Sequence, residues 1–112
     1  MKILLDHNLD WRLSRHLPEH EVKTTYKMGW GLLKNGLLLS EAETAGFKLM
    51  LTSDFNIKHQ QNLSLRSISI LVLRAPNNKI ETHIEMLDDV RAALAIIQPG
   101  QLLEIFHSDL QP

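Results

Sequence analysis

The chain has 112 residues, of which 44% are hydrophobic and 22% charged, with a net charge of −1 and no cysteine. These values are typical of one globular domain over residues 1–112, and they exclude a disordered chain, a disulfide framework and a thiolate metal site. No apolar run approaches the ~18 residues of a membrane span, and a charge at the sixth residue interrupts the apolar start too early for a signal peptide, so we expect a cytoplasmic protein.

The first part of the chain predicts two strands, at residues 2–6 and 21–25, with a short helix between them. Asn8 is the expected N-cap of this helix, and Pro18 ends it. Between these positions the helix buries a stripe of leucines spaced four apart: Leu9, Leu13 and Leu17.

A loop with two glycines is expected at residues 26–34, because no periodic pattern runs through it. The next helix covers residues 36–45, with Asn35 as its cap and Gly46 ending it in the left-handed conformation. A third strand follows at residues 47–52.

Residues 55–65 are polar and ambiguous, and residues 68–73 predict a fourth strand. Asn78 and Glu81 resemble a capping box at the start of a long helix, which a proline–glycine pair stops before a fifth strand at residues 102–106. The helix places its apolar residues on one face: Ile80, Ile84, Leu87, Val90, Leu94 and Ile97.

The predicted strands and helices alternate along the chain, and the strands are continuous apolar runs. This pattern is typical of an α/β fold whose parallel sheet is covered on both faces by right-handed crossovers.

Two of the apolar runs end at an aspartate, Asp6 and Asp54. The carboxyl ends of parallel strands open on one edge of a sheet, where ligands of α/β proteins bind, so the two carboxylates are expected to lie close together. Such a pair suits Mg²⁺, which polarises a phosphodiester and lowers the pKa of an attacking water. The alternative is local: aspartates often follow strands because they make turns and cap helices.

Further ligands come from a short list of oxygen-bearing side chains: Asn8, Asn35, Glu41 and Glu43. The two glutamates are two residues apart on a helix, so both cannot face the site, and each is more often a solvated charge.

Other polar residues near the aspartates are candidates for substrate contacts. His7 is a candidate base or phosphate contact, and Arg12 and Lys34 are candidate phosphate contacts. Gln60 and Gln61 either line the cleft or cap a turn. Trp11 and Trp30 are expected to be packing anchors rather than base-stacking platforms.

Positive charge is concentrated in the part of the chain that contains both aspartates. Residues 1–74 hold ten Lys/Arg and seven Asp/Glu, whereas residues 75–112 hold two and six. This distribution permits an acidic partner such as RNA, and an ordinary solvated surface explains it equally well.

A phosphoacceptor receiver domain shares the alternation of strands and helices and an aspartate after the third strand. It needs two acids after the first strand, where this chain has Asp6 and His7, and a lysine after the fifth, where residues 106–108 read Phe-His-Ser. We therefore set this class aside.

Four segments resemble short stand-alone PIN-like proteins, relatives of PilT N-terminus domains and of VapC-type toxins. They are Leu-Leu-Asp-His-Asn-Leu at 4–9, Lys-Asn-Gly at 34–36, Leu-Thr-Ser-Asp-Phe at 51–55 and Gln-Gln-Asn-Leu at 60–63. The resemblance implies a three-layer α/β/α sandwich around a mainly parallel five-stranded sheet and a ribonuclease site for Mg²⁺ or Mn²⁺. It also implies a bacterial toxin–antitoxin setting, with RNA and a small antitoxin protein as partners.

Asp6 and Asp54 match family acids, and Asn8 matches a polar position beside the first. The chain departs from the pattern at His7, where members usually carry an acid, and at Asn35, which stands with Gly36 and Leu37 where members carry acids.

Two functions follow from this comparison of residues. The first is a ribonuclease in which Asp6 and Asp54 hold the metal, with Asn8 and Glu41 completing its shell. The second is a binding module of the same fold with little chemistry, which binds RNA or a protein partner. A homodimer is a further expectation, with candidate interface residues in one loop: Trp30, Leu32 and Leu33.

Overall fold

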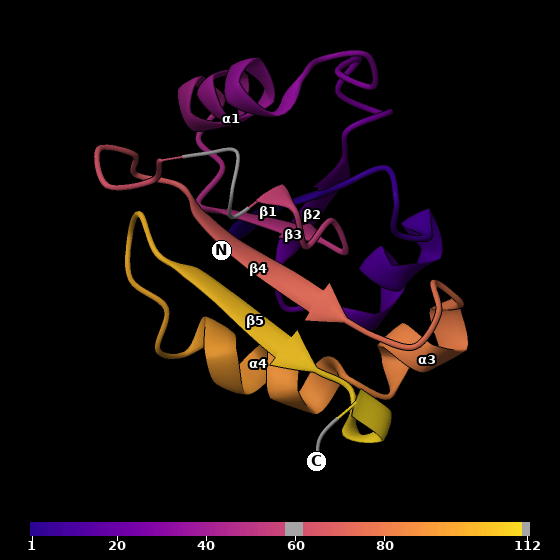
Figure 1. Ribbon diagram of the computed structural model, residues 1–112. Helices are drawn as coiled ribbons and strands as arrows, with labels where there is room; N and C mark the ends of the chain where they lie inside the picture. Colours follow the sequence, from indigo (N-terminus) through magenta and orange to yellow (C-terminus); the bar gives the residue numbers. More distant parts are fainter. Residues whose placement is uncertain (58–61, 111–112) are drawn as a thin grey trace.

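Five strands form one parallel sheet in the order β2-β1-β3-β4-β5 in a computed structural model that describes residues 1–57 and 62–110 (Figure 1). The strands are β1 (Lys2–Leu5), β2 (Glu21–Thr24), β3 (Leu49–Thr52), β4 (Ser69–Arg74) and β5 (Leu102–Phe106). All five lie where the sequence predicts a strand. The inner strands β1, β3 and β4 are buried along almost their whole length, as continuous apolar runs require.

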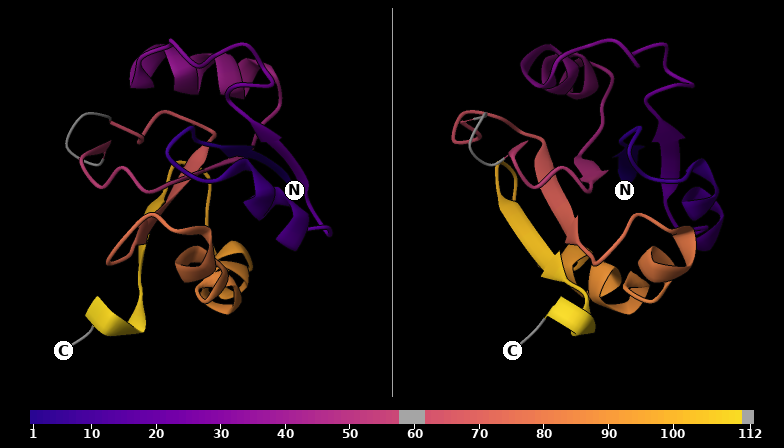
Figure 2. Two further views of the ribbon diagram at one scale, coloured as in Figure 1. Left: turned by 90° about the vertical axis from the view of Figure 1, so that its right-hand side faces the viewer. Right: turned by 45° about the vertical axis from the view of Figure 1, so that its right-hand side comes forward.

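Helices cover both faces of this sheet (Figures 1 and 2). The helices of the chain are η1 (Trp11–His16), α1 (Asn35–Thr44), α3 (Ile80–Ile84), α4 (Leu87–Leu94) and η2 (Ser108–Leu110), of which η1 and η2 are 3₁₀-helices and η2 buries no residue. Helix α1 packs on one face, which we call the α1 face. Helices η1, α3 and α4 pack on the other, the α4 face. Within the described part of the chain, no helix has the length and apolar character to cross a bilayer.

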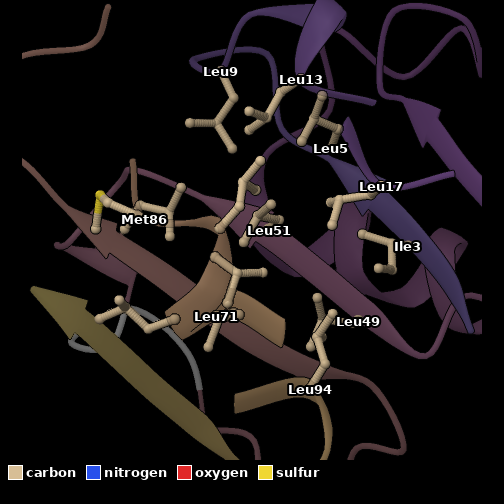
Figure 3. Close-up of a cluster of buried hydrophobic side chains, with 14 residues drawn as sticks. Ile3, Leu5, Leu9, Leu13, Leu17, Leu49, Leu51, Leu71, Met86 and Leu94 are labelled. Carbon is tan, nitrogen blue, oxygen red and sulfur yellow. The ribbon is translucent and has the colours of Figure 1, made fainter. Parts of the chain in front are cut away.

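Each face of the sheet carries its own hydrophobic core, because successive strand residues point to opposite sides. Figure 3 shows the core of the α4 face, where the stripe from η1 meets side chains of β1 and β3. Its main members are Ile3, Leu5, Leu9, Leu13, Leu17, Leu49, Leu51, Leu71, Leu87, Val90 and Leu94. The core of the α1 face contains Leu4, Leu38, Leu39, Phe47, Met50, Ile57, Ile68, Ile70 and Val72.

The first helix differs from its prediction in type and in cap. It is a 3₁₀-helix that begins after Asp10, whose carboxylate accepts the backbone N–H of Arg12 at 2.9 Å. Asn8 is not its N-cap, because the Asn8 amide bonds to the end of β3 instead. The leucine stripe is nevertheless buried as expected.

The caps of the other helices also differ from the prediction at two positions. Asn35 is the first residue of α1 rather than its cap, and Lys34 occupies the cap position without a side-chain hydrogen bond. Asn78 makes no capping box; Asn77 accepts the backbone N–H two residues later at 3.0 Å. Gly46 has a φ of 87°, which confirms the left-handed end of α1.

The long helix expected after β4 is divided into α3 and α4. The chain turns at Glu85 and Met86, and Met86 is buried in the core. Glu85 accepts a hydrogen bond from Nε2 of His107 at 2.6 Å, since Nδ1 of that ring accepts the backbone N–H of Asp109. The apolar stripe continues across the break, so the sequence predicted correctly which residues face the core. The prediction of one unbroken helix was wrong.

The crossover connections do not all have the same hand. The β1–β2 connection crosses the α4 face toward one edge of the sheet, and β4–β5 crosses the same face toward the opposite edge. The β2–β3 connection crosses the α1 face, and Ile57 and Leu63 of the β3–β4 connection pack there too. The hand of β4–β5 is therefore opposite to the others, and the expectation of right-handed crossovers throughout is wrong. On this face, α4 contacts β5 and α3 contacts η1.

Candidate functional site

The candidate site lies at the carboxyl edge of the sheet, between β1 and β3. Asp6 follows β1 directly, and its backbone N–H donates to the carbonyl oxygen of Leu51 in β3 at 3.0 Å. From β1 the chain leads to β2 on one side and later returns to β3 on the other, so the strand order reverses here. Ligands of open α/β sheets bind at such a switch point.

Thr52, the last residue of β3, is the centre of a hydrogen-bond network at this edge. Its side chain is fully buried, and its hydroxyl donates to Oδ2 of Asp6 at 2.7 Å. The hydroxyl oxygen of Thr52 also accepts the backbone N–H of Asp54 at 3.0 Å and Nδ2 of Asn8 at 3.3 Å. A single hydroxyl therefore joins all three residues that the sequence placed at this edge.

Asn8 ties the loop after β1 to the end of β3. Besides its contact with Thr52, its Oδ1 accepts the backbone N–H of Ser53 at 3.2 Å. Both the oxygen and the nitrogen of the Asn8 amide therefore bond to residues at the end of β3. These bonds hold the loop that contains Asp6 in position.

The Asp6 carboxylate is buried, with 4% of its surface exposed. Oδ1 accepts the backbone N–H of His7 at 2.9 Å and lies 3.1 Å from Nδ1 of the same residue. An ionised carboxylate offers about four lone-pair directions, so these two bonds to Oδ1 and the one from Thr52 to Oδ2 leave about one direction, on Oδ2, for a ligand. The His7 side chain is 71% exposed and free to turn aside.

Asp54 is both a neighbour of this network and a turn residue. Its Oδ1 accepts the backbone N–H of Asn56 at 3.1 Å, the local role that the alternative interpretation expected. Its Oδ2 has no hydrogen-bond partner among the described residues, so one oxygen remains available for a ligand.

No third acid joins Asp6 and Asp54 in the part of the chain that the structure describes. In residues 1–57 and 62–110, no three His, Cys, Asp or Glu side chains are grouped as a metal site requires. Glu41 is exposed on α1. Glu43 lies at the opposite edge of the sheet, where its carboxylate accepts the backbone N–H of Ser67, just before β4, at 2.7 Å.

A cleft of about 1050 Å³ lies beside Asp6, between η1 and the end of β2. It brings together Asp6, His7 and Arg12 from the predicted set. Lys34 and Asn35, at the start of α1, do not line it, and neither do the site residues Asn8 and Asp54. The remaining two candidates, Gln60 and Gln61, lie outside the described residues.

Arg12 is held in a two-point ion pair with Asp10. Its Nε and Nη2 donate to the two oxygens of that carboxylate at 3.0 and 2.6 Å. These hydrogen bonds, with that from the backbone of Arg12, lower the pKa of Asp10 from 3.8 to about 2. The guanidinium therefore faces the cleft with much of its charge already compensated.

The role of Thr52 in the site was not predicted from the sequence. Thr52 ends an apolar run and has the sequence signature of an ordinary strand residue, although a buried hydroxyl must find partners.

The two tryptophans expected to be packing anchors differ in the structure. Trp30 is one, since its ring packs edge-on against that of Phe47 with the ring centroids 5.9 Å apart. Trp11, by contrast, is 56% exposed and lines the cleft, with the guanidinium of Arg15 over its ring at 4.6 Å.

Comparison with known protein families, with curated proteins and with solved structures finds no match for this chain.

Proposed function

We propose that this protein is a PIN-like metal-dependent ribonuclease with a three-layer α/β/α fold, which hydrolyses RNA phosphodiesters with Mg²⁺ or Mn²⁺. The observation that carries the proposal is that the carboxylate of Asp6 and the backbone N–H of Asp54 both bond to the hydroxyl of Thr52, at the switch point of the sheet. The adjoining cleft, with Lys23 and Lys27 in its wall, supports an anionic substrate.

The oxygen donors at this edge fit one hard divalent cation. Mg²⁺ is often held by only one or two carboxylates, with waters and substrate phosphate completing its shell. Asp6 and Asp54 would hold it, and Asn8 would contribute through water. When bound, the cation polarises the phosphodiester and lowers the pKa of an attacking water. The set does not fit a two-metal centre within the described residues, because Glu41 does not join it.

The chain's own residues orient the acid and receive a proton. Thr52 and the backbone of His7 donate to the two oxygens of Asp6 and so fix its carboxylate. In hydrolysis a water oxygen bonds to phosphorus and loses a proton, an ester P–O bond breaks, and the departing ribose oxygen takes up a proton from solvent. The His7 ring, with Nδ1 3.1 Å from Asp6, keeps Nε2 free to take that proton.

The biological setting we propose is that of the toxin component of a bacterial toxin–antitoxin pair in the cytoplasm. RNA is the substrate and a small antitoxin protein is the partner. A homodimer through the loop before α1 rests on Leu32, which is fully exposed. Trp30 and Leu33 are partly buried against the core of the α1 face and offer less surface.

A cleavage assay with Mg²⁺ or Mn²⁺ on varied single-stranded RNA tests the nuclease. We expect Asp6→Asn and Asp54→Asn each to lower the rate about 100-fold or more, because each removes a charge that the metal needs. Asp88→Asn is the matched control, since Asp88 is fully exposed on α4. Absence of cleavage by the wild type, or equal rates in the aspartate variants, would contradict the proposal.

A binding module with little chemistry is the second candidate, and the absence of a third acid from the site among the described residues favours it. This function predicts that calorimetry finds no Mn²⁺ affinity in the millimolar range while RNA or a protein partner still binds. Tight Mn²⁺ binding that Asp6→Asn abolishes would count against it.

A further inference from the structure

We propose that the cleft between η1 and β2 is a binding site for unpaired RNA bases, formed by Trp11 and Tyr26 with Lys23 and Lys27. The cleft has a volume of about 1050 Å³, and all four residues line it. This inference rests on RNA being the ligand in the proposed function, and it adds where the strand lies and which form of RNA is recognised.

Aromatic side chains stand on both walls of the cleft. Trp11 begins η1 and is 56% exposed, and Tyr26, just after β2, is 88% exposed. Large apolar rings are usually buried, so two exposed rings lining one cleft form a surface on which a planar ligand can stack.

The Trp11 ring is held in place from one side. The guanidinium of Arg15 lies over it at 4.6 Å, a cation–π arrangement that orients the indole without burying it. A fixed aromatic platform loses little freedom when a base stacks on it, which favours binding.

The charge of the cleft suits a phosphate backbone. Lys23 and Lys27 come from the β2 wall, and neither side chain has an ion-pair partner among the residues that the structure describes. On the η1 wall, the charges of Arg12 and Asp10 compensate each other. The two lysines therefore supply uncompensated positive charge next to the rings.

The combination of two exposed aromatic rings with two lysines favours the binding of single-stranded over double-stranded RNA. In a duplex the bases are stacked on one another and their faces are inaccessible, whereas unpaired bases stack on protein aromatics. Asp6 also lines the cleft, so a strand bound here passes directly beside the proposed metal site.

Fluorescence anisotropy with a labelled 12-nucleotide RNA, measured in EDTA to prevent cleavage, tests the site. We expect Trp11→Ala and Tyr26→Ala each to raise Kd about 10-fold, because base stacking is lost, and Trp11→Phe to stay within about 3-fold of the wild type. A duplex of the same sequence should bind at least about 10-fold more weakly. Phe106→Ala, at an exposed ring on the far edge strand, is the aromatic control.

The lysines are tested by the salt dependence of the same binding. For single strands the slope of log K against log salt changes by about 0.7 for each phosphate contact, so Lys23→Ser with Lys27→Ser should reduce it by about 1.4. Lys48→Ser, at an exposed position before β3, should leave the slope unchanged.

Equal affinity of Trp11→Ala and the wild type, equal binding of duplex and single strand, or no binding of any RNA would each overturn this inference. The result is separable from the nuclease proposal. Binding in EDTA that depends on Trp11 and Tyr26, without cleavage in Mg²⁺ or Mn²⁺, would support the cleft and contradict the nuclease. Cleavage with Kd unchanged in both aromatic variants would do the reverse.

Discussion

The two edges of the sheet each hold a carboxylate in a hydrogen-bond network, Asp6 at the carboxyl edge and Glu43 at the amino edge. Glu43 receives bonds from Nη1 of Arg66 at 2.6 Å and from the backbone and hydroxyl of Ser67 at 2.7 and 3.0 Å. Asp6 receives uncharged donors, from Thr52 and the backbone of His7, and it borders a cleft.

The difference separates a structural acid from a candidate functional one. The charge of Glu43 is neutralised by Arg66, which also donates to the carbonyl oxygen of Gly36 and so ties the segment before β4 to α1. The only ion-pair partner of Asp6 in the described part of the chain is the exposed ring of His7. A buried carboxylate without a fixed cation is the one left to attract a ligand cation.

The largest expected effect is at the hydroxyl of Thr52. Thr52→Val keeps the shape of the side chain but leaves the Asp6 carboxylate and the Asp54 N–H short of a partner, so we expect a loss of about 3 kcal/mol in the free energy of unfolding. Urea denaturation measures it. Thr52→Ser keeps the hydroxyl and should lose only about 1 kcal/mol, through the missing methyl group. Equal losses in the two variants would mean that packing, rather than the network, sets the stability of this edge.

Part of the arrangement at the carboxyl edge could be predicted from the sequence. Continuous apolar runs ending at Asp6 and Asp54 predicted parallel strands with both residues at one edge, where the carboxylate of Asp6 and the backbone N–H of Asp54 bond to Thr52. The hydroxyl itself was missed, because a threonine at the end of a strand has the same local signature whether or not it bonds to distant residues.

Other features depend on tertiary packing and have no local signal. The break between α3 and α4 falls inside an unbroken apolar period, and it forms where Glu85 meets His107, 22 residues later. The cleft is assembled from η1 and the turn after β2, two segments with no shared motif, so Tyr26 read only as part of a loop.

The next effect is at the amino edge. Glu43→Gln replaces two accepting oxygens by one oxygen and an NH₂ group, which faces the donors of Arg66 or Ser67. We expect a loss of about 1.5 kcal/mol, less than at Thr52 because both partners of the ion pair are about 20% exposed. RNA binding and cleavage should be unchanged. A variant that folds normally but binds RNA less tightly would contradict the division between the two edges.

The pH dependence of stability tests the structural role of Glu43 at the amino edge. Burial by itself raises the pKa of Glu43, but the bonds from Ser67 and Arg66 outweigh it and lower the pKa below the ordinary 4.5. Glu43 thus contributes stability above pH 4.5, and this contribution is lost as pH falls through its lower folded pKa. The difference in unfolding free energy between wild type and Glu43→Gln should shrink over that window in denaturation at several pH values.

The wild type must be compared with Glu43→Gln because His83 also makes the stability depend on pH. Burial lowers the pKa of His83 below 6.5, and its ring nitrogens have no partners in the described structure, so stability also falls as pH drops below 6.5. This effect is common to the wild type and Glu43→Gln and cancels in the difference. A difference that stayed constant from pH 6 to pH 3 would contradict the role assigned to Glu43.

The smallest effect concerns Asp10, an acid at the carboxyl edge that resembles Glu43 in having an arginine partner but is on the surface. NMR titration should find its pKa at about 2, and Arg12→Gln should return it toward 3.8 while leaving unfolding almost unchanged. Arg15→Gln, on the neighbouring arginine over Trp11, should leave the Asp10 titration as it is. If Arg12 contacts phosphate, RNA will draw it from Asp10 and raise this pKa. An unchanged titration with RNA bound would instead confine the phosphate contacts to Lys23 and Lys27.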